Sequence, residues 1–335
     1  MSPENLIQAL EGRQEHYALE KECQKLGIPV DQVKHYWHKG KHFSIFSKKK
    51  GQPTYQEIRD ELIQEMSEYA PEYPVIERHK ERDGHLLIID PADIHIGKIA
   101  SKTETGETYD QSIAVQRAVE GVRGLLSKAK GWKVDKIVFV AGNDILHTDT
   151  PKKTTTSGTS QDVDGMWYDH YKTAKRLYVH LLELCLAVAD VEVVFCPSNH
   201  DFMSGFMLVD SVLSWFSKCE QIIFHADMRH RKYLRYYNNV MGFSHGDGAK
   251  VADLPLLMAQ EAGDAWLSKH RYFFTHHVHH KIAKDYGSVC VESLRSPSGT
   301  DGWHARNGYQ HAPKAVEGFL MDKEHGQVAR LTHIF

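Results

Sequence analysis

Apolar and polar positions alternate in two different periods along the chain. From residue 85 onward, short runs of aliphatic and aromatic residues are separated by longer segments with apolar residues every three or four positions. Short apolar runs that end at Gly, Pro or Asp are typical of buried strands, and the longer period is typical of helices. The pattern predicts strands over residues 85–90, 136–141, 191–196, 235–244 and 272–275, and helices over 109–130 and 166–189.

This alternation of strands and helices predicts an α/β body with a largely parallel sheet and helices on both faces. Sheets of this kind bind their ligands in the loops beyond the carboxyl ends of the strands. The segments that follow the predicted strands are therefore where we expect the chemistry of this protein.

The first 50 residues have a different pattern. Residues 15–26 are rich in helix formers, a Gly-Ile-Pro turn follows, and helical spacing restarts over residues 30–38. Helix, turn and helix is the order of a helix-turn-helix, so we expect a small all-α module over residues 1–50, with a basic wing over 42–50. An ordinary helical hairpin with a solvated lysine face is the alternative.

Charge is distributed unevenly over the 335 residues, although the net charge is only −3. Residues 1–50 carry nine Lys and Arg against six acids, residues 51–84 carry four against nine, and residues 85–335 are nearly neutral. This predicts a basic module, an acidic connector with a helix over 55–69, and a large body. The lysines that could contact a nucleic acid, DNA in preference, are Lys34, Lys39, Lys41, Lys48, Lys49 and Lys50.

Cysteine usage and hydropathy point to a cytoplasmic protein without a membrane partner. The five cysteines are scattered and form no C-x-x-C pair, as expected for reduced thiols. No apolar run approaches the 18 or so residues that a membrane span needs.

Histidine, carboxylate and carboxamide side chains follow each predicted strand of the body. In chain order these residues are Asp93, His95, Asn143, Asp144, Asn199, His200, Asp201, His245, His277 and His279. Mixed nitrogen and oxygen ligands without cysteine suit first-row divalent ions. Because the set is too large for one ion, we expect two ions per chain, Mn²⁺ in preference, with Fe²⁺, Zn²⁺ or Mg²⁺ as alternatives.

In their order and spacing, these residues resemble the motifs of the calcineurin-like metallophosphoesterase superfamily, D-x-H, G-D, G-N-H-D/E, H and G-H-x-H. The Gly-Asn-Asp run and the threonine-rich segment behind it are similar to a phage-encoded branch related to DNA-repair exonucleases. The resemblance covers residues 85–335 and implies a layered sheet sandwich flanked by helices.

The resemblance also implies a role for each matched residue. One ion would be held by Asp93, His95 and His279, and the other by Asn199, His245 and His277. Asp144 would bridge the ions, and His200 would be the catalytic imidazole, oriented by Asp201.

Three positions depart from the motifs. Asn143 stands where the family has its bridging aspartate, so the bridge is either Asp144 or Asn143; we favour Asp144, because a neutral amide bridges two cations poorly. Ser198 and His276 replace glycines that normally serve tight turns.

Two segments, residues 148–164 and 296–309, could form walls of a substrate site. The candidate contacts are Asn143, Lys152, Lys153, Gln161, Asp162, Trp303 and His304. A flexible surface loop is the alternative for the first segment, and a buried anchoring role is the alternative for Trp303, which could otherwise stack on a base.

Taken together, these features predict a dinuclear-metal phosphodiesterase, with a nuclease favoured. It would hydrolyse nucleic-acid phosphodiester bonds by metal-activated hydroxide, with His200 assisting the leaving group. The alternatives are a phosphoesterase for a small nucleotide or a phosphoprotein, with the first module mediating oligomerisation, and a non-catalytic metal-dependent scaffold that binds nucleic acid.

Overall fold

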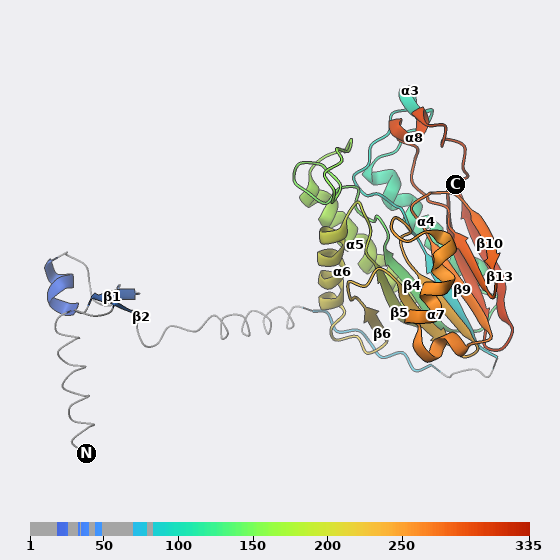
Figure 1. Ribbon diagram of the computed structural model, residues 1–335, viewed down its shortest axis with the longest axis horizontal. Coiled ribbons are helices and arrows are strands. Elements are labelled where there is room, and N and C mark those ends of the chain that lie inside the picture. The colour runs from blue at the N-terminus through green and yellow to red at the C-terminus, as the bar shows by residue number, and fades with distance from the viewer. Residues whose placement is uncertain (1–18, 26–32, 34, 40–43, 49–69, 79–82) are drawn as a thin grey trace, which may run out of the picture. The chain divides into compact units, whose positions relative to one another are not determined.

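A computed structural model of the chain describes residues 19–25, 33, 35–39, 44–48, 70–78 and 83–335 (Figure 1). They belong to two compact units, Met1–Glu68 and Tyr69–Phe335, each of which is described by itself. Within the described ranges, no helix has both the length and the apolar composition required to cross a bilayer.

The first unit combines a helix with a β-hairpin. Residues 19–25 are helical, as predicted, but β1 (His35–Lys39) and β2 (Ser44–Lys48) pair as antiparallel strands. The prediction of a second helix over 30–38 is therefore wrong for its second half, as is the all-α description. The aromatic and β-branched residues of these two segments favour strands over helices, and this preference outweighs the helical spacing. Lys34, Lys41, Lys49, Lys50 and the predicted connector helix over 55–69 lie outside the described residues.

The second unit contains two sheets. In the six-stranded sheet the order is β13-β12-β3-β4-β5-β6, and in the five-stranded sheet it is β10-β11-β9-β8-β7. The strands of the first sheet are β3 (His85–Asp90), β4 (Val134–Gly142), β5 (Asp190–Cys196), β6 (Ile222–His225), β12 (Ala315–Asp322) and β13 (Gly326–Ile334). Those of the second are β7 (Lys232–Tyr236), β8 (Asn239–Phe243), β9 (His270–Thr275), β10 (Ile282–Tyr286) and β11 (Val289–Ser293).

Helices cover the outer faces of both sheets. The helices are α3 (Lys102–Thr105), α4 (Gln111–Lys128), α5 (Trp167–Leu186), α6 (Phe202–Trp215), α7 (Leu254–Glu261) and α8 (Gly302–Arg306), with 3₁₀ turns η2 (Val251–Asp253) and η3 (Gly263–Leu267). One core lies between the six-stranded sheet and α4–α6, a second between the two sheets, and a third beneath α7 (Figure 1). This α/β arrangement confirms the predicted layered sheet sandwich flanked by helices. The expectation of one largely parallel sheet with helices on both faces is wrong, because both sheets mix parallel and antiparallel pairs and each packs one face against the other sheet.

The predicted strands and helices of the body are confirmed, with one correction. Strand β3 has the predicted bounds, and α4 and α5 lie within the predicted helices. The single strand predicted over 235–244 is instead the hairpin of β7 and β8, which turns at Tyr237 with a φ of 48°. The turn contains Asn238 and Asn239 but no glycine or proline, and strand-forming residues flank it on both sides, so the segment reads as one strand.

A hydrogen bond between α5 and the end of β4 fixes the loop that follows β4. Tyr178 of α5 is buried, and its hydroxyl accepts a hydrogen bond of 2.8 Å from the backbone N–H of Gly142. Gly142 has a φ of 81°, and a Cβ atom there would lie 2.3 Å from the Cys196 carbonyl oxygen. Only glycine fits this turn, which directs the following residues toward the ends of the neighbouring strands.

Glu192 on β5 provides a test of the electrostatics of the sheet. Its carboxylate accepts hydrogen bonds from His225 Nε2, at 3.1 Å, and from Lys136 Nζ. The His225 hydrogen bond, with further support from Lys136, lowers the pKa of Glu192 to about 2. A lowered carboxyl pKa stabilises the fold above the unfolded pKa of about 4.3, and this stabilisation is lost as the pH falls toward 2.

We therefore expect Glu192→Gln to lower the free energy of unfolding by about 1 kcal/mol at pH 7, a value reduced for partial solvent exposure. The cost should shrink toward zero near pH 2. Urea denaturation of both proteins across this range measures the difference, and an equal cost at every pH would contradict the ionic role of Glu192.

Candidate metal centre

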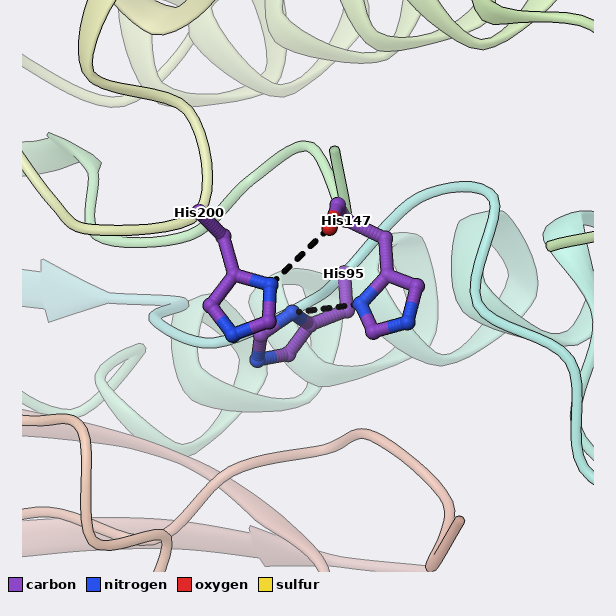
Figure 2. A group of neighbouring side chains, drawn as sticks. All are labelled: His95, His147 and His200. Atoms are coloured by element: carbon purple, nitrogen blue, oxygen red, sulfur yellow. Dashed lines mark hydrogen bonds between the residues drawn. The ribbon is translucent and has the colours of Figure 1, made fainter. Parts of the chain in front are cut away.

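The loops after β3, β4, β5, β8 and β9 meet at one end of the two sheets. Three histidines from the first three of these loops, His95, His147 and His200, form a group at this end (Figure 2). The rings of His147 and His200 are stacked, with centroids 5.2 Å apart, and His147 Nδ1 lies 3.2 Å from His95 Nδ1. The ends of the strands, where we predicted the chemistry, therefore bring together imidazole side chains from three separate loops.

The His200 ring is held by a backbone carbonyl. Its Nδ1 donates a hydrogen bond of 2.9 Å to the carbonyl oxygen of His147, which fixes the tautomer (Figure 2). His200 also lines the cavity described below. The prediction that Asp201 orients His200 is wrong. The Asp201 carboxylate accepts from the N–H of Leu146, at 2.9 Å, and from the hydroxyl of Ser198, at 2.6 Å.

Asp201 instead supports the loop that carries Asp144. Ser198 Oγ donates to Asp201 and accepts a hydrogen bond of 2.7 Å from the backbone N–H of Asp144. Burial, with a contribution from the Asp144 carboxylate, raises the pKa of Asp201 to about 7. The serine that replaces a glycine of the motif thus connects two acidic residues.

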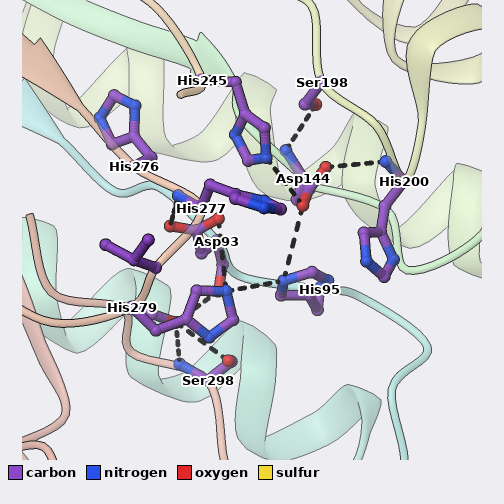
Figure 3. Close-up of polar contacts among 12 residues, drawn as sticks. Asp93, His95, Asp144, Ser198, His200, His245, His276, His277, His279 and Ser298 are labelled. Atoms are coloured by element: carbon purple, nitrogen blue, oxygen red, sulfur yellow. Dashed lines mark hydrogen bonds and ion pairs between the residues drawn. The ribbon is translucent and has the colours of Figure 1, made fainter. Parts of the chain in front are cut away.

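One cluster of potential ligands contains Asp93, His95 and His279, whose ligand atoms lie within 4.8 Å of one another (Figure 3). His279 Nε2 is 3.3 Å from His95 Nε2 and 3.5 Å from Asp93 Oδ1. Asp93 and His95 follow β3 of the six-stranded sheet, and His279 follows β9 of the five-stranded sheet. This is the set predicted for one ion, and it draws on both sheets.

The second cluster contains Asp144, His245 and His277 (Figure 3). His245 Nε2 lies 3.1 Å from Asp144 Oδ2 and 3.0 Å from Asn199 Oδ1. Here too the two sheets contribute, since Asp144 and Asn199 follow β4 and β5 while His245 and His277 follow β8 and β9. The four residues predicted around the other ion are brought together.

Asp144 belongs to the second cluster and also lies near the first. The same Oδ2 atom that is 3.1 Å from His245 is 3.9 Å from His95 Nε2 (Figure 3). Asn143 is fully buried, and its side-chain amide meets no hydrogen-bond partner among the described residues. Its backbone carbonyl accepts instead from Asp93 N–H at 2.8 Å. The geometry favours Asp144 as the bridging position and gives Asn143 a backbone role.

The backbone of the site is unusual. Of the eight non-glycine residues with positive φ in the described part of the chain, six belong to these loops, with values from 50° to 71°: Asp93, His95, Asn143, Asp144, His277 and His279. Such conformations are costly for residues with a Cβ atom and tend to concentrate at functional sites. Asn and Asp tolerate them best, and three of the six positions, Asp93, Asn143 and Asp144, carry these residues.

With the exception of His245, the protonation states fit divalent cations. Burial lowers the pKa of His245, but the Asp144 and Asp93 carboxylates outweigh burial and raise it to about 9, so this ring would lose a proton when a cation binds. Burial raises the pKa of Asp144, but His245 and His200 outweigh it, and the net pKa is lowered. Burial lowers the pKa values of His95, His277 and His279, so these imidazoles are neutral and able to act as ligands. Asp93 Oδ1 and His245 Nδ1 are buried without a hydrogen-bond partner in the described part of the chain. Ionised carboxylates beside neutral imidazoles are a donor set for cations.

Sequence reasoning missed several residues around these clusters. His276, the second departure from a glycine, is buried and lies 3.0 Å from both Ser244 O and Asp90 Oδ2, which keeps a buried carboxylate paired behind the site. His147 and Lys98 follow the motif residues Asp144 and His95 by three positions. A histidine or lysine three positions after a predicted metal ligand could have identified both residues as part of the site.

A cavity of about 510 Å³ opens over both clusters. Of the predicted substrate residues, Gln161, Asp162, Trp303 and His304 line it, whereas Lys152 and Lys153 are not among its lining residues. Hydroxyl side chains of the threonine-rich segment form one wall, and that segment is held in place by Asp149. The Asp149 carboxylate accepts from Thr156 Oγ1 at 2.8 Å and from Ser204 N–H at 2.7 Å.

Helix α8 forms the opposite wall. Lys98 is 1% exposed and forms an ion pair of 2.9 Å with Asp301, the N-cap residue of α8. Asp301 also accepts from the N–H of His304 at 2.8 Å and from its ring Nδ1 at 2.7 Å. Trp303 is 63% exposed, so the buried anchoring role considered for it is wrong.

No protein-family model matches this sequence, and no curated protein matches it. Among solved structures, Vps29 from Entamoeba histolytica complexed with Zn²⁺ is 12% identical, with a TM-score of 0.31 over 74% of this chain and 98% of that one. A predicted phosphoesterase from Streptococcus pneumoniae is 13% identical, with a TM-score of 0.28 over 75% and 98%. A hypothetical protein from Pyrococcus horikoshii is 12% identical, with a TM-score of 0.34 over 74% and 87%. At these values the matches do not identify the chain's family.

Proposed function

We propose that the protein is a metal-dependent phosphodiesterase with two divalent ions per chain, and that it acts as a nuclease. The observation that carries this proposal is that Asp144 of the second cluster also lies near His95 of the first and accepts a hydrogen bond from the backbone N–H of His200. Paired cation sites that share a carboxylate suit displacement at phosphorus.

Different residues of the chain would hold the ions and assist the leaving group. Asp93, His95 and His279 would hold one ion, Asn199, His245 and His277 the other, and Asp144 would contact both. Two ions there would supply Lewis-acid neutralisation of charge on the phosphoryl oxygens and lower the pKa of water. His200, with Nδ1 held by the His147 carbonyl, would in its imidazolium form give the Nε2 proton to the departing oxygen and become neutral.

The walls of the cavity support a nucleic-acid substrate. Trp303 and Tyr309, 63% and 58% exposed, lie with ring centroids 5.9 Å apart at its rim. Exposed aromatic rings bind unpaired bases by stacking. The hydroxyl groups of Thr155, Ser157 and Thr159 on the opposite wall can donate hydrogen bonds to phosphate or sugar oxygens.

The purified full-length chain, supplied with Mn²⁺, should be tested against labelled single- and double-stranded DNA, RNA, cyclic nucleotides and phosphate monoesters. We expect turnover of polynucleotides, fastest for single strands. Turnover confined to monoesters or to cyclic nucleotides would replace the nuclease by a small-molecule phosphoesterase. Metal binding without turnover of any ester would favour the scaffold.

The basic module is proposed to bind the substrate backbone. A chain that begins at Tyr69 should hydrolyse a small chromogenic diester as fast as the full chain, because the metal clusters lie in the second unit. Its affinity for DNA should fall, and the slope of log K against log salt should become shallower by about 0.7 to 0.9 for each phosphate that the module neutralises. Equal affinity and slope across a salt series would leave the module without this role, and a changed mass in light scattering would assign it to oligomerisation.

A further inference from the structure

A second cavity, of about 360 Å³, adjoins the cavity over the metal clusters. The two cavities share five lining residues, among them His279 of the first cluster together with His304 and Tyr309. A molecule bound at the metal clusters can therefore extend past His304 into this second cavity.

The lining of the second cavity is basic. Lys314 and three further histidines, His280, His304 and His311, contribute to it, and no carboxylate is among the lining residues. Two of these rings have a fixed orientation. His280 Nδ1 donates to Val278 O, and His304 Nδ1 donates to Asp301 Oδ1, both at 2.7 Å.

The charge of Lys314 is only partly balanced. Its Nζ donates to Thr300 Oγ1 at 3.1 Å, and the Glu107 carboxylate lies 3.9 Å away. That carboxylate also accepts from Thr300 N–H at 2.7 Å and lies 3.5 Å from Arg117. Burial lowers the pKa of Lys314 despite the opposing effect of Glu107, as expected for an ammonium group that lacks a full counter-charge.

We propose that the second cavity binds a phosphate group of the substrate adjacent to the phosphate that is cleaved. The proposal rests on the phosphodiesterase function and adds to it a preference for substrates with at least two phosphates. Lys314 and the imidazole of His311 supply the charge-assisted hydrogen bonds. This phosphate could be an internucleotide diester or the terminal monoester of a strand.

Matched substrates test the proposal with the full-length chain and Mn²⁺. Thymidine 3′-(p-nitrophenyl phosphate) is compared with its 5′-phosphorylated form, and thymidine 5′-(p-nitrophenyl phosphate) with its 3′-phosphorylated form. In one of the two pairs we expect the added phosphate to raise kcat/KM by about 10-fold or more, the effect of a charge-assisted hydrogen bond. Converting the added phosphate to a methyl diester distinguishes the two kinds of phosphate. A site for a terminal monoester should lose the increase in kcat/KM, and a site for an internucleotide diester should keep it.

Variants locate the effect in the second cavity. The quantity compared is kcat/KM with the added phosphate divided by kcat/KM without it, for the responsive pair. Lys314→Gln should bring this ratio to within about 2-fold of one, whereas Lys314→Arg should retain most of the ratio. His311→Asn should lower the ratio by less than Lys314→Gln does. Lys130→Gln removes an exposed lysine outside both cavities and should leave the ratio unchanged. A wild-type ratio near one in both pairs, or a ratio that survives both Lys314→Gln and His311→Asn, would overturn the proposal.

Binding without turnover separates this inference from the proposed function. Inorganic phosphate is titrated by calorimetry into the chelator-treated full-length chain, where we expect Lys314→Gln to weaken binding about 10-fold and Lys130→Gln to have no effect. Absence of diester turnover alongside this result would reject the phosphodiesterase but keep the phosphate site. Turnover with phosphate binding that is indifferent to Lys314 and His311 would reject the phosphate site alone.

Discussion

Asp144→Asn is expected to remove both metal ions. The substitution keeps the size of the side chain and tolerates the φ of 58°, so the loop should survive, but each ion loses an anionic ligand. Without that charge the two cations also repel each other at short range. We expect metal affinity to fall by more than the 10- to 100-fold typical of residues that only support ligands, with loss of turnover. Elemental analysis after gel filtration measures the occupancy.

Asn143→Gly is the matched control for this experiment. Glycine suits the φ of 50° at this position, and the Asn143 amide makes no hydrogen bond within the described part of the chain. Two ions per chain should therefore remain in this variant. Metal loss in Asn143→Gly together with full occupancy in Asp144→Asn would transfer the bridging role to Asn143.

His200→Ala should reduce kcat by at least about 100-fold while both ions stay bound, since one general acid typically contributes that much. The loss should depend on the leaving group. A diester that releases p-nitrophenolate needs little help from an acid, so its turnover should fall far less than that of DNA, which releases an alkoxide. Parallel kinetics on the two substrates, with elemental analysis of the same samples, measure both effects.

His230→Ala serves as the comparison, because His230 is exposed, stacks its ring on Phe202 and lines neither cavity. It should leave both turnover rates unchanged. An equal loss on the two substrates in His200→Ala would remove the leaving-group role. Metal loss in that variant would make His200 a ligand within the group of His95, His147 and His200.

Much of the body can be predicted from sequence, because the local secondary-structure propensity of each segment agrees there with the burial of its apolar side chains in the fold. Buried strands such as β3 are continuous apolar runs, and α5 keeps its apolar face over five turns. The hairpin of β7 and β8 escapes prediction because its turn uses Tyr237 in a left-handed conformation without glycine. The strand β1 escapes it because helical spacing and strand propensity conflict over residues 30–38.

The candidate site is predictable to the extent that its residues are fixed by strand ends. The loops after β3, β4, β5, β8 and β9 have to meet, and they bring the predicted ligands together. The orienting partner of His200 is not predictable, because a backbone carbonyl carries no sequence signature. The role of Lys98 depends on α8, which lies about 200 positions later in the chain, so only the folded structure reveals it.

Each ligand cluster takes side chains from both sheets, and this has a consequence for the thermodynamics of the fold. A cation held by such a set is bound only when the sheets are packed, so its binding free energy adds to the free energy of unfolding by RT ln(1 + [M]/Kd), where [M] is the free metal concentration. For ions present at 100 times their dissociation constant, this amounts to about 2.7 kcal/mol per site. The same two ions proposed for chemistry would therefore also act as reversible cross-links between the layers, and chelation would loosen the sandwich at the interface on which the active geometry depends.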